Sequence, residues 1–100
     1  MMPQTTKILF GEYREYKKPF YEQGIQRTLT TPVLVIRGDI PKGVFDFLVL
    51  KTPDIFAPKE GKREAYVGFN VSSIDECRGL VKKLNLDLAQ HYCRIDLQQQ

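Results

Sequence analysis

The stretch "VSSIDECRGLVKKLNLDL", Val71–Leu88, combines a helix-start signal with a regular apolar spacing in this chain of 100 residues. Ser73 lies three positions before Glu76, which is a capping box: the serine hydroxyl can accept from the third amide, and the glutamate can reach back to the serine amide. Apolar residues then recur at spacings of three and four, namely Ile74, Cys77, Val81, Leu84 and Leu88. The stretch therefore predicts one amphipathic helix that begins at Ser73.

The residues before this helix alternate as strands do. Residues 65–71 place apolar side chains on one side and polar or small ones on the other, with Gly68 indicating a bulge or a close approach of backbone. Residues 24–30 alternate in the same way. Residues 5–18 fit both a strand and a helix, and we interpret them as a long strand closed by Pro19.

The most regular part of this region is a predicted hairpin. Residues 32–39, "PVLVIRGD", are apolar on both faces and β-branched, as expected of a central strand. Pro41 and Gly43 then favour a tight turn, and "VFDFLVLK", residues 44–51, returns as the second strand. Beyond the helix, residues 91–97 alternate again and predict a short last strand.

These elements predict a single α+β domain over residues 1–100. We expect an antiparallel sheet of about four to five strands followed by one amphipathic helix packed on a face of the sheet. Residues 1–5 and 98–100 have little apolar surface to bury, and we expect them to be disordered.

The composition is that of an ordinary soluble globular protein, with 42% hydrophobic and 27% charged residues. No apolar run approaches the roughly 20 residues that span a bilayer, and no signal peptide is visible, so we expect a cytoplasmic protein without a membrane partner. The net charge is +3, and residues 1–65 hold eleven Lys or Arg against eight acids. Such a surplus suits contact with phosphate or an acidic partner.

The stretch "YREYKKPFYEQGIQR", Tyr13–Arg27, combines cations with aromatic side chains, the two components that single-strand binding needs. The candidate binding residues are Tyr13, Arg14, Tyr16, Lys17, Lys18, Tyr21 and Arg27, together with Lys59, Lys62 and Arg63 of a later basic loop. An alternative interpretation is an ordinary edge strand whose lysines discourage aggregation, because acidic residues are interleaved with the cations.

Catalysis and metal binding find little support. Cys77, His91 and Cys93 could suggest zinc, yet the chain has no Cys-x-x-Cys pair and no evident fourth ligand. Cys77 also belongs to the apolar side of the helix, which is typical of a core residue. We expect a protein that is not an enzyme and needs no cofactor.

Two segments resemble a known family. "GFNVSSIDECRGLVKKL", Gly68–Leu84, and "KGVFDFLVL", Lys42–Leu50, are similar to the last strand, the helix and the central hairpin of the single-stranded-DNA-binding domain of the positive transcription cofactor family. The resemblance implies an accessory role in transcription or replication and a homodimer paired through the helix.

The residues also give a reason to expect this dimer. Leu80 and Leu86 lie off the apolar side of the helix and leave more apolar surface than one sheet face readily covers. The predicted dimer interface consists of Ile74, Cys77, Val81, Leu84 and Leu88.

Two functions remain open from the sequence. The first is a small binding protein for single-stranded DNA or RNA with little sequence preference. The second is a protein-interaction module, such as an inhibitor or an accessory subunit, that acts on a protein partner.

Overall fold

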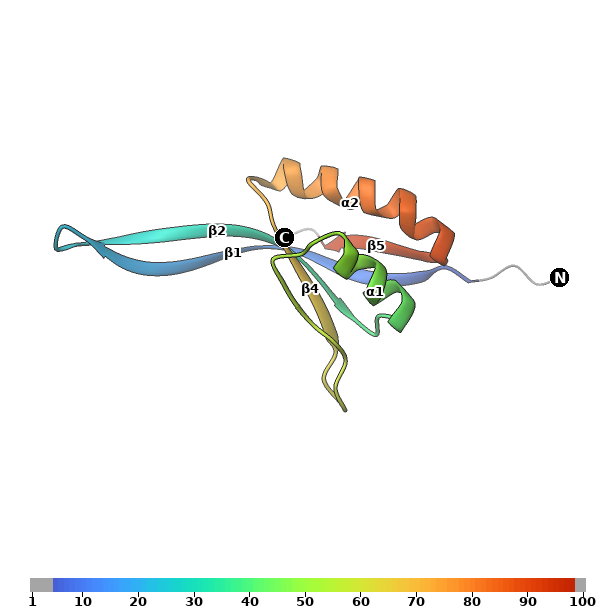
Figure 1. The fold of residues 1–100 in the computed structure, drawn as a ribbon. Coiled ribbons are helices and arrows are strands. Elements are labelled where there is room, and N and C mark those ends of the chain that lie inside the picture. Colours follow the sequence, from blue (N-terminus) through green and yellow to red (C-terminus); the bar gives the residue numbers. More distant parts are fainter. Residues whose placement is uncertain (1–4, 99–100) are drawn as a thin grey trace.

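The computed structural model describes residues 5–98 and contains a five-stranded sheet with two α-helices (Figure 1). The strand order is β3-β4-β2-β1-β5, and all neighbours are antiparallel except β1 and β5, which are parallel. The strands are β1 Lys7–Glu22, β2 Ile25–Gly38, β3 Ile55–Ala57, β4 Ala65–Asn70 and β5 Cys93–Gln98. The predicted α+β class is confirmed.

The second helix, α2, spans Ile74–Leu88 and begins where the sequence predicts. The Ser73 hydroxyl accepts a hydrogen bond from the Glu76 amide at 3.2 Å. The Glu76 carboxylate was expected to accept from the Ser73 amide. It reaches one residue further back and accepts from the Ser72 amide at 2.8 Å and from the Ser72 hydroxyl. A 3₁₀ turn, Ala89–His91, follows α2 directly.

The first helix, α1, spans Lys42–Leu50 and corrects the predicted hairpin, whose second strand does not exist. Val44 and Leu48, four positions apart, are buried, whereas Phe45 and Phe47 pack at the margin of the core. Pro41 precedes the helix, where a missing amide donor costs nothing. The expectation of a single helix is wrong for the same reason.

Both helices cover the same face of the sheet (Figure 1). The core lies between them and the strands, and its fully buried side chains include Leu34 and Ile36 of β2, Val67 of β4, Leu48 of α1 and Leu88 of α2. No helix of residues 5–98 packs on the other face.

Strands β1 and β2 are much longer than their neighbours. β5 pairs with β1 only over Lys7–Glu12, and β4 pairs with β2 only over Val33–Gly38. Beyond these contacts residues 15–32 form a two-stranded ribbon, here called the arm, that projects from the body (Figure 1). The radius of gyration of 15.8 Å exceeds the roughly 13 Å of a compact chain of this length, because of this projection.

Several expectations about the strands are resolved. Residues 5–18 are a strand, but it continues through Pro19 to Glu22, and the two strands expected over 24–30 and 32–39 are one continuous β2. The strand expected over 91–97 is β5. Residues 1–4 and 99–100, expected to be disordered, lie outside the described residues, whereas Gln98 is the last residue of β5.

Candidate nucleic-acid interface

The sheet face without helices, here called the open face, gathers side chains from all five strands. Because side chains alternate along a strand and paired residues share a face, the register defines its members. They are Ile8, Phe10, Glu12, Arg14 and Tyr16 of β1, Thr31, Val33, Val35 and Arg37 of β2, Ile55 and Ala57 of β3, Tyr66, Gly68 and Asn70 of β4, and Arg94 and Asp96 of β5.

One row of the open face places a cation between two aromatic side chains. Arg37 of β2 pairs with Phe10 of β1 on one side and with Tyr66 of β4 on the other. Phe10 is 54% exposed and Tyr66 is 37% exposed. Arg37 also lies 3.8 Å from a carboxylate oxygen of Glu64. The row presents flat apolar surfaces and a positive charge to solvent.

A groove of about 650 Å³ lies beside this row. Its floor is apolar: Val33 and Val35 are only 4% and 8% exposed although no helix covers them. Gly68 lets the Ile55 side chain pack over the floor, since a Cβ atom at position 68 would lie 2.6 Å from the Cγ2 atom of Ile55. Tyr16 and Tyr66 also line the groove, which is thus a hollow with aromatic and apolar walls.

Polar groups stand at the margin of the groove. The Arg14 guanidinium lies 2.9 Å from the Glu12 carboxylate, and this hydrogen bond, with a smaller contribution from Tyr16, raises the pKa of Arg14. Asp54 accepts a hydrogen bond from the Asn70 amide at 2.7 Å. The groove therefore offers cationic and anionic groups within one small area.

The arm extends the open face away from the body. Tyr16, Lys18 and Phe20 follow one another at every second position of β1, opposite Thr31, Leu29 and Arg27 of β2. Glu22 and Ile25, at the tip of the arm, also belong to this face. A two-stranded ribbon twists strongly, so this face turns gradually along the arm.

The arm ends in a tight two-residue turn. Gln23 and Gly24 both have positive φ, 53° and 78°, as a type I′ hairpin turn requires. The Glu22–Ile25 pair that flanks such a turn is hydrogen-bonded, and the pairs along the ribbon then alternate between non-hydrogen-bonded and hydrogen-bonded. The pairs Pro19–Thr28 and Glu15–Pro32 both fall among the non-hydrogen-bonded ones.

The backbone nitrogens of Pro19 and Pro32 consequently point outward, one on each edge of the ribbon. Pro19 interrupts the row of donors along the β1 edge and disfavours pairing with another chain there, whereas Pro32 lies at the base of the arm, where its carbonyl accepts from the Val71 amide at 3.0 Å.

The structure divides the predicted binding residues of Tyr13–Arg27 between the two faces. Arg14, Tyr16, Lys18 and Arg27 belong to the open face and its extension. Tyr13, Lys17 and Tyr21 belong to the opposite face, and Tyr13 packs against the core while its hydroxyl donates to Glu15 at 3.0 Å.

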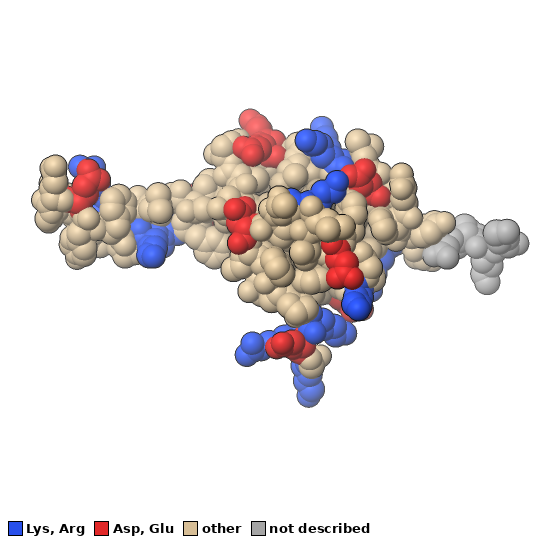
Figure 2. Space-filling model, in the orientation of Figure 1, with Lys and Arg blue, Asp and Glu red and all other residues tan. Residues whose placement is uncertain are grey.

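The predicted basic loop forms a separate projection. Lys59, Lys62 and Arg63 lie in the connection between β3 and β4, which extends from the body in a different direction from the arm (Figures 1 and 2). Lys59 contacts Asp39 at 3.5 Å, as does Lys7 at 3.0 Å, and these contacts, that of Lys7 first, lower the pKa of Asp39. The loop and the arm do not form one basic patch.

The three residues of the aromatic and cationic row, Phe10, Arg37 and Tyr66, were not foreseen. Each lies in a segment that the sequence marks as a strand, but only the register places them in one row. Alternation alone shows which side of a strand is polar and not which strands are neighbours, so no local pattern could have identified this row.

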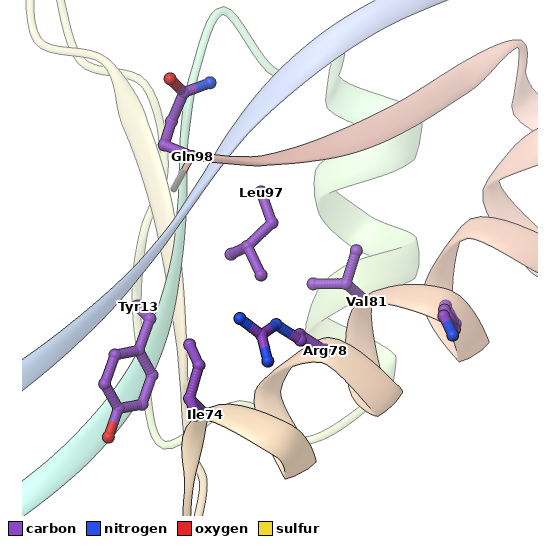
Figure 3. Close-up of a pocket in the computed structure, with 7 residues that line it drawn as sticks. Tyr13, Ile74, Arg78, Val81, Leu97 and Gln98 are labelled. Atoms are coloured by element: carbon purple, nitrogen blue, oxygen red, sulfur yellow. The ribbon is translucent and has the colours of Figure 1, made fainter. Parts of the chain in front are cut away.

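A second cavity, of about 530 Å³, lies on the helix side between the start of α2 and the end of β5 (Figure 3). It is lined by Tyr13, Ile74, Arg78, Val81, Lys82, Leu97 and Gln98. The Arg78 side chain extends between Ile74 and Leu97 (Figure 3) and lies 3.4 Å from Asp75. Its walls offer one aromatic ring, Tyr13, whereas the groove of the open face has two, so the groove is the better candidate site.

The residues predicted for a dimer interface lie inside the chain. Cys77, Val81, Leu84 and Leu88 are buried against the sheet, and Ile74 is half-buried. They pack in the core and are not exposed for a partner. Leu86, 76% exposed, is the apolar side chain that α2 presents to solvent, so a dimer through α2 stays a prediction that would have to use another surface.

The cysteines and the histidine are also held by packing. Cys77 and Cys93 are buried free thiols, and burial raises the pKa of each. The His91 ring packs 5.1 Å from the Phe47 ring, centroid to centroid. In the part of the chain that the structure describes, no group of three His, Cys, Asp or Glu residues is placed to hold a metal ion.

No protein-family model, curated protein or solved structure matches this chain. The resemblance to the positive transcription cofactor family therefore gains no support, and its Lys42–Leu50 segment is a helix where that family has a strand. None of the helices in residues 5–98 is both long and apolar enough to cross a membrane.

Proposed function

We propose that this protein is a non-enzymatic protein that binds single-stranded nucleic acid, and that the bound strand lies along the open face and the arm. The observation that carries the proposal is the alternation on one face of β1. Arg14, Tyr16, Lys18 and Phe20 alternate between cationic and aromatic side chains, and Glu12, the preceding residue on this face, pairs with Arg14. Bases stack on exposed aromatic rings and phosphates pair with cations, which is how single strands are bound without strong sequence preference.

The dimensions of the strand agree with this use. Residues two apart on one face of a strand are about 6.6 Å apart. Tyr16, Lys18 and Phe20 thus place a cation midway between two rings, over a length that a few unstacked nucleotides can follow. Lys18 makes no ion pair with any of the described residues, so its charge is available to a phosphate.

An anisotropy titration of a fluorescein-labelled thymidine 15-mer tests the proposal. We expect binding at low salt that weakens steeply as salt rises, because phosphate contacts release counterions. Tyr16→Ala should weaken binding by about 1–3 kcal/mol through lost stacking. Tyr21→Ala is the matched control, since Tyr21 is also exposed on β1 but lies on the opposite face.

Two results would reject the proposal: no binding at low salt, or equal losses for the two tyrosine variants. The first result would leave the second candidate function, an interaction with a protein partner. A specific observation favours that alternative, because Ile25 and Leu29 are aliphatic and more than half exposed on the arm. Aliphatic side chains suit a protein interface, whose affinity depends little on salt.

A further inference from the structure

The groove of the open face differs from the stacking surface around it, because it combines an enclosed apolar floor with a fixed carboxylate. Its volume of about 650 Å³ is within the range of small-molecule sites. A planar ring can lie over Val33 and Val35, with Tyr16 toward one end of the groove and Tyr66 toward the other, and such apolar and aromatic surfaces hold bases that have left their stack.

Asp54 supplies the directional group of the groove. Its backbone amide donates to the Gly68 carbonyl at 2.9 Å, and its Oδ2 atom accepts from the Asn70 amide at 2.7 Å. These two bonds fix the carboxylate relative to the groove floor. The Oδ1 atom has no hydrogen-bond partner among residues 5–98, and Oδ2 keeps a second lone pair.

An ionised carboxylate only accepts hydrogen bonds, so it selects an edge that offers two adjacent donors. Guanine has such an edge, since its N1–H and N2–H₂ groups lie side by side. On the Watson–Crick edges of adenine, cytosine, thymine and uracil, every donor has an acceptor as its neighbour. A carboxylate therefore pairs with two donors of guanine and with one donor of any other base.

Two cations at the margin of the groove can contact phosphates next to such a base. Arg14 and Arg37 both line the groove, from β1 and β2 respectively. Their ion pairs with Glu12 and Glu64 involve partly exposed side chains, which a phosphate can join or replace. The groove thus provides an aromatic wall, an acceptor pair and phosphate contacts together.

We infer that this groove is a guanine-selective base pocket in which Asp54 reads the N1–H and N2–H₂ edge of one nucleotide. The inference rests on the proposed function, of which it names the preferred base. The pocket would select guanine at one nucleotide position, while the rest of the binding surface accepts any base.

Competition titrations with unlabelled thymidine 15-mers test this, with the central base replaced by guanine, adenine or hypoxanthine. We expect the guanine strand to bind about tenfold more tightly than the unsubstituted strand, as a bidentate contact gives. Adenine should give no gain. Hypoxanthine lacks the N2 amino group and should lose most of the gain, which assigns the effect to that group.

Asp54→Asn is the decisive variant, because an asparagine oxygen can still accept from the Asn70 amide while the second acceptor becomes a donor. We expect it to lose the guanine preference and to keep its affinity for the unsubstituted strand. Asp96→Asn is the control, since Asp96 pairs with Phe10 at the margin of the same face and does not line the groove.

The outcomes separate the two proposals. Equal binding of all four strands, or a guanine preference that persists in Asp54→Asn, overturns the guanine pocket and leaves single-strand binding in place. If no strand binds at low salt, the proposed function fails and the pocket fails with it.

Discussion

Strands β1 and β2 pass through two environments, and the same residue types behave differently in each. Leu34 of β2, in the body, is completely buried between the sheet and the helices, whereas Leu29, five positions earlier in the arm, is 54% exposed. The body is stabilised by burial of apolar side chains, and the arm only by its ladder and its turn. Apolar residues of the arm therefore contribute little to folding.

The largest effect should come from truncating the same residue type in the two environments. Leu34→Ala removes a buried side chain and leaves a cavity, so we expect a loss of about 2–5 kcal/mol in the free energy of unfolding. Leu29→Ala should change it by less than about 0.5 kcal/mol. Urea denaturation measures both, and similar losses would mean that the arm packs on the body in solution.

Glycine substitutions give a smaller contrast of the same kind. Gly68→Ala should cost about 1–3 kcal/mol by overpacking, because the new Cβ atom would lie 2.6 Å from Ile55 Cγ2. Gly24 has no heavy atom within 4 Å of a Cβ position, and its φ of +78° is the only strain on a substitution. Denaturation of the two variants should show the larger loss for Gly68→Ala.

Gly24→Ala should instead cost about 1 kcal/mol and act within the arm. Amide hydrogen exchange is the measurement: we expect faster exchange over residues 15–32 and unchanged exchange in the buried part of β2, residues 33–38. Faster exchange throughout β2 would show that the arm and the body unfold as one unit.

The smallest effect concerns the body alone and depends on pH. Hydrogen bonds from the Ser72 hydroxyl and amide lower the pKa of Glu76 below its ordinary value of 4.5. Its folded-state pKa is thus below the unfolded one, so its stabilisation is present above the unfolded pKa and is lost as the pH falls through the folded pKa.

Glu76→Gln should accordingly lower the Tm at neutral pH, and the difference from the native chain should shrink on acidification. Thermal unfolding followed by circular dichroism at several pH values measures this. A difference that stays constant down to the acid range would show that the carboxylate charge is not involved.

The sequence predicts the elements whose signals are local. The cap at Ser73 and the regular apolar spacing of α2 lie within the helix itself, and the prediction is confirmed. The prediction for the α1 segment was wrong because two patterns overlap there: Phe45, Phe47 and Val49 alternate as in a strand, while Val44 and Leu48 have helical spacing. Only packing against β4 selects the helical pattern.

Strand order and register could not be predicted, because they depend on contacts between distant segments. The parallel pairing of β1 with β5 joins the two ends of the chain. The same limitation affected the candidate site: the stretch Tyr13–Arg27 was identified as a unit, but its alternation assigns Lys17 and Lys18 to opposite faces. Its best aromatic neighbours on the open face, Phe10 and Tyr66, come from outside it.

The most direct test of the account uses these two adjacent lysines. We would titrate the labelled thymidine 15-mer with Lys18→Ala and Lys17→Ala at several salt concentrations. We expect that Lys18→Ala weakens binding and reduces the slope of log K against log salt by about 0.7, whereas Lys17→Ala leaves the slope unchanged. Equal changes in the two variants, or a loss confined to Lys17→Ala, would contradict recognition through the open face.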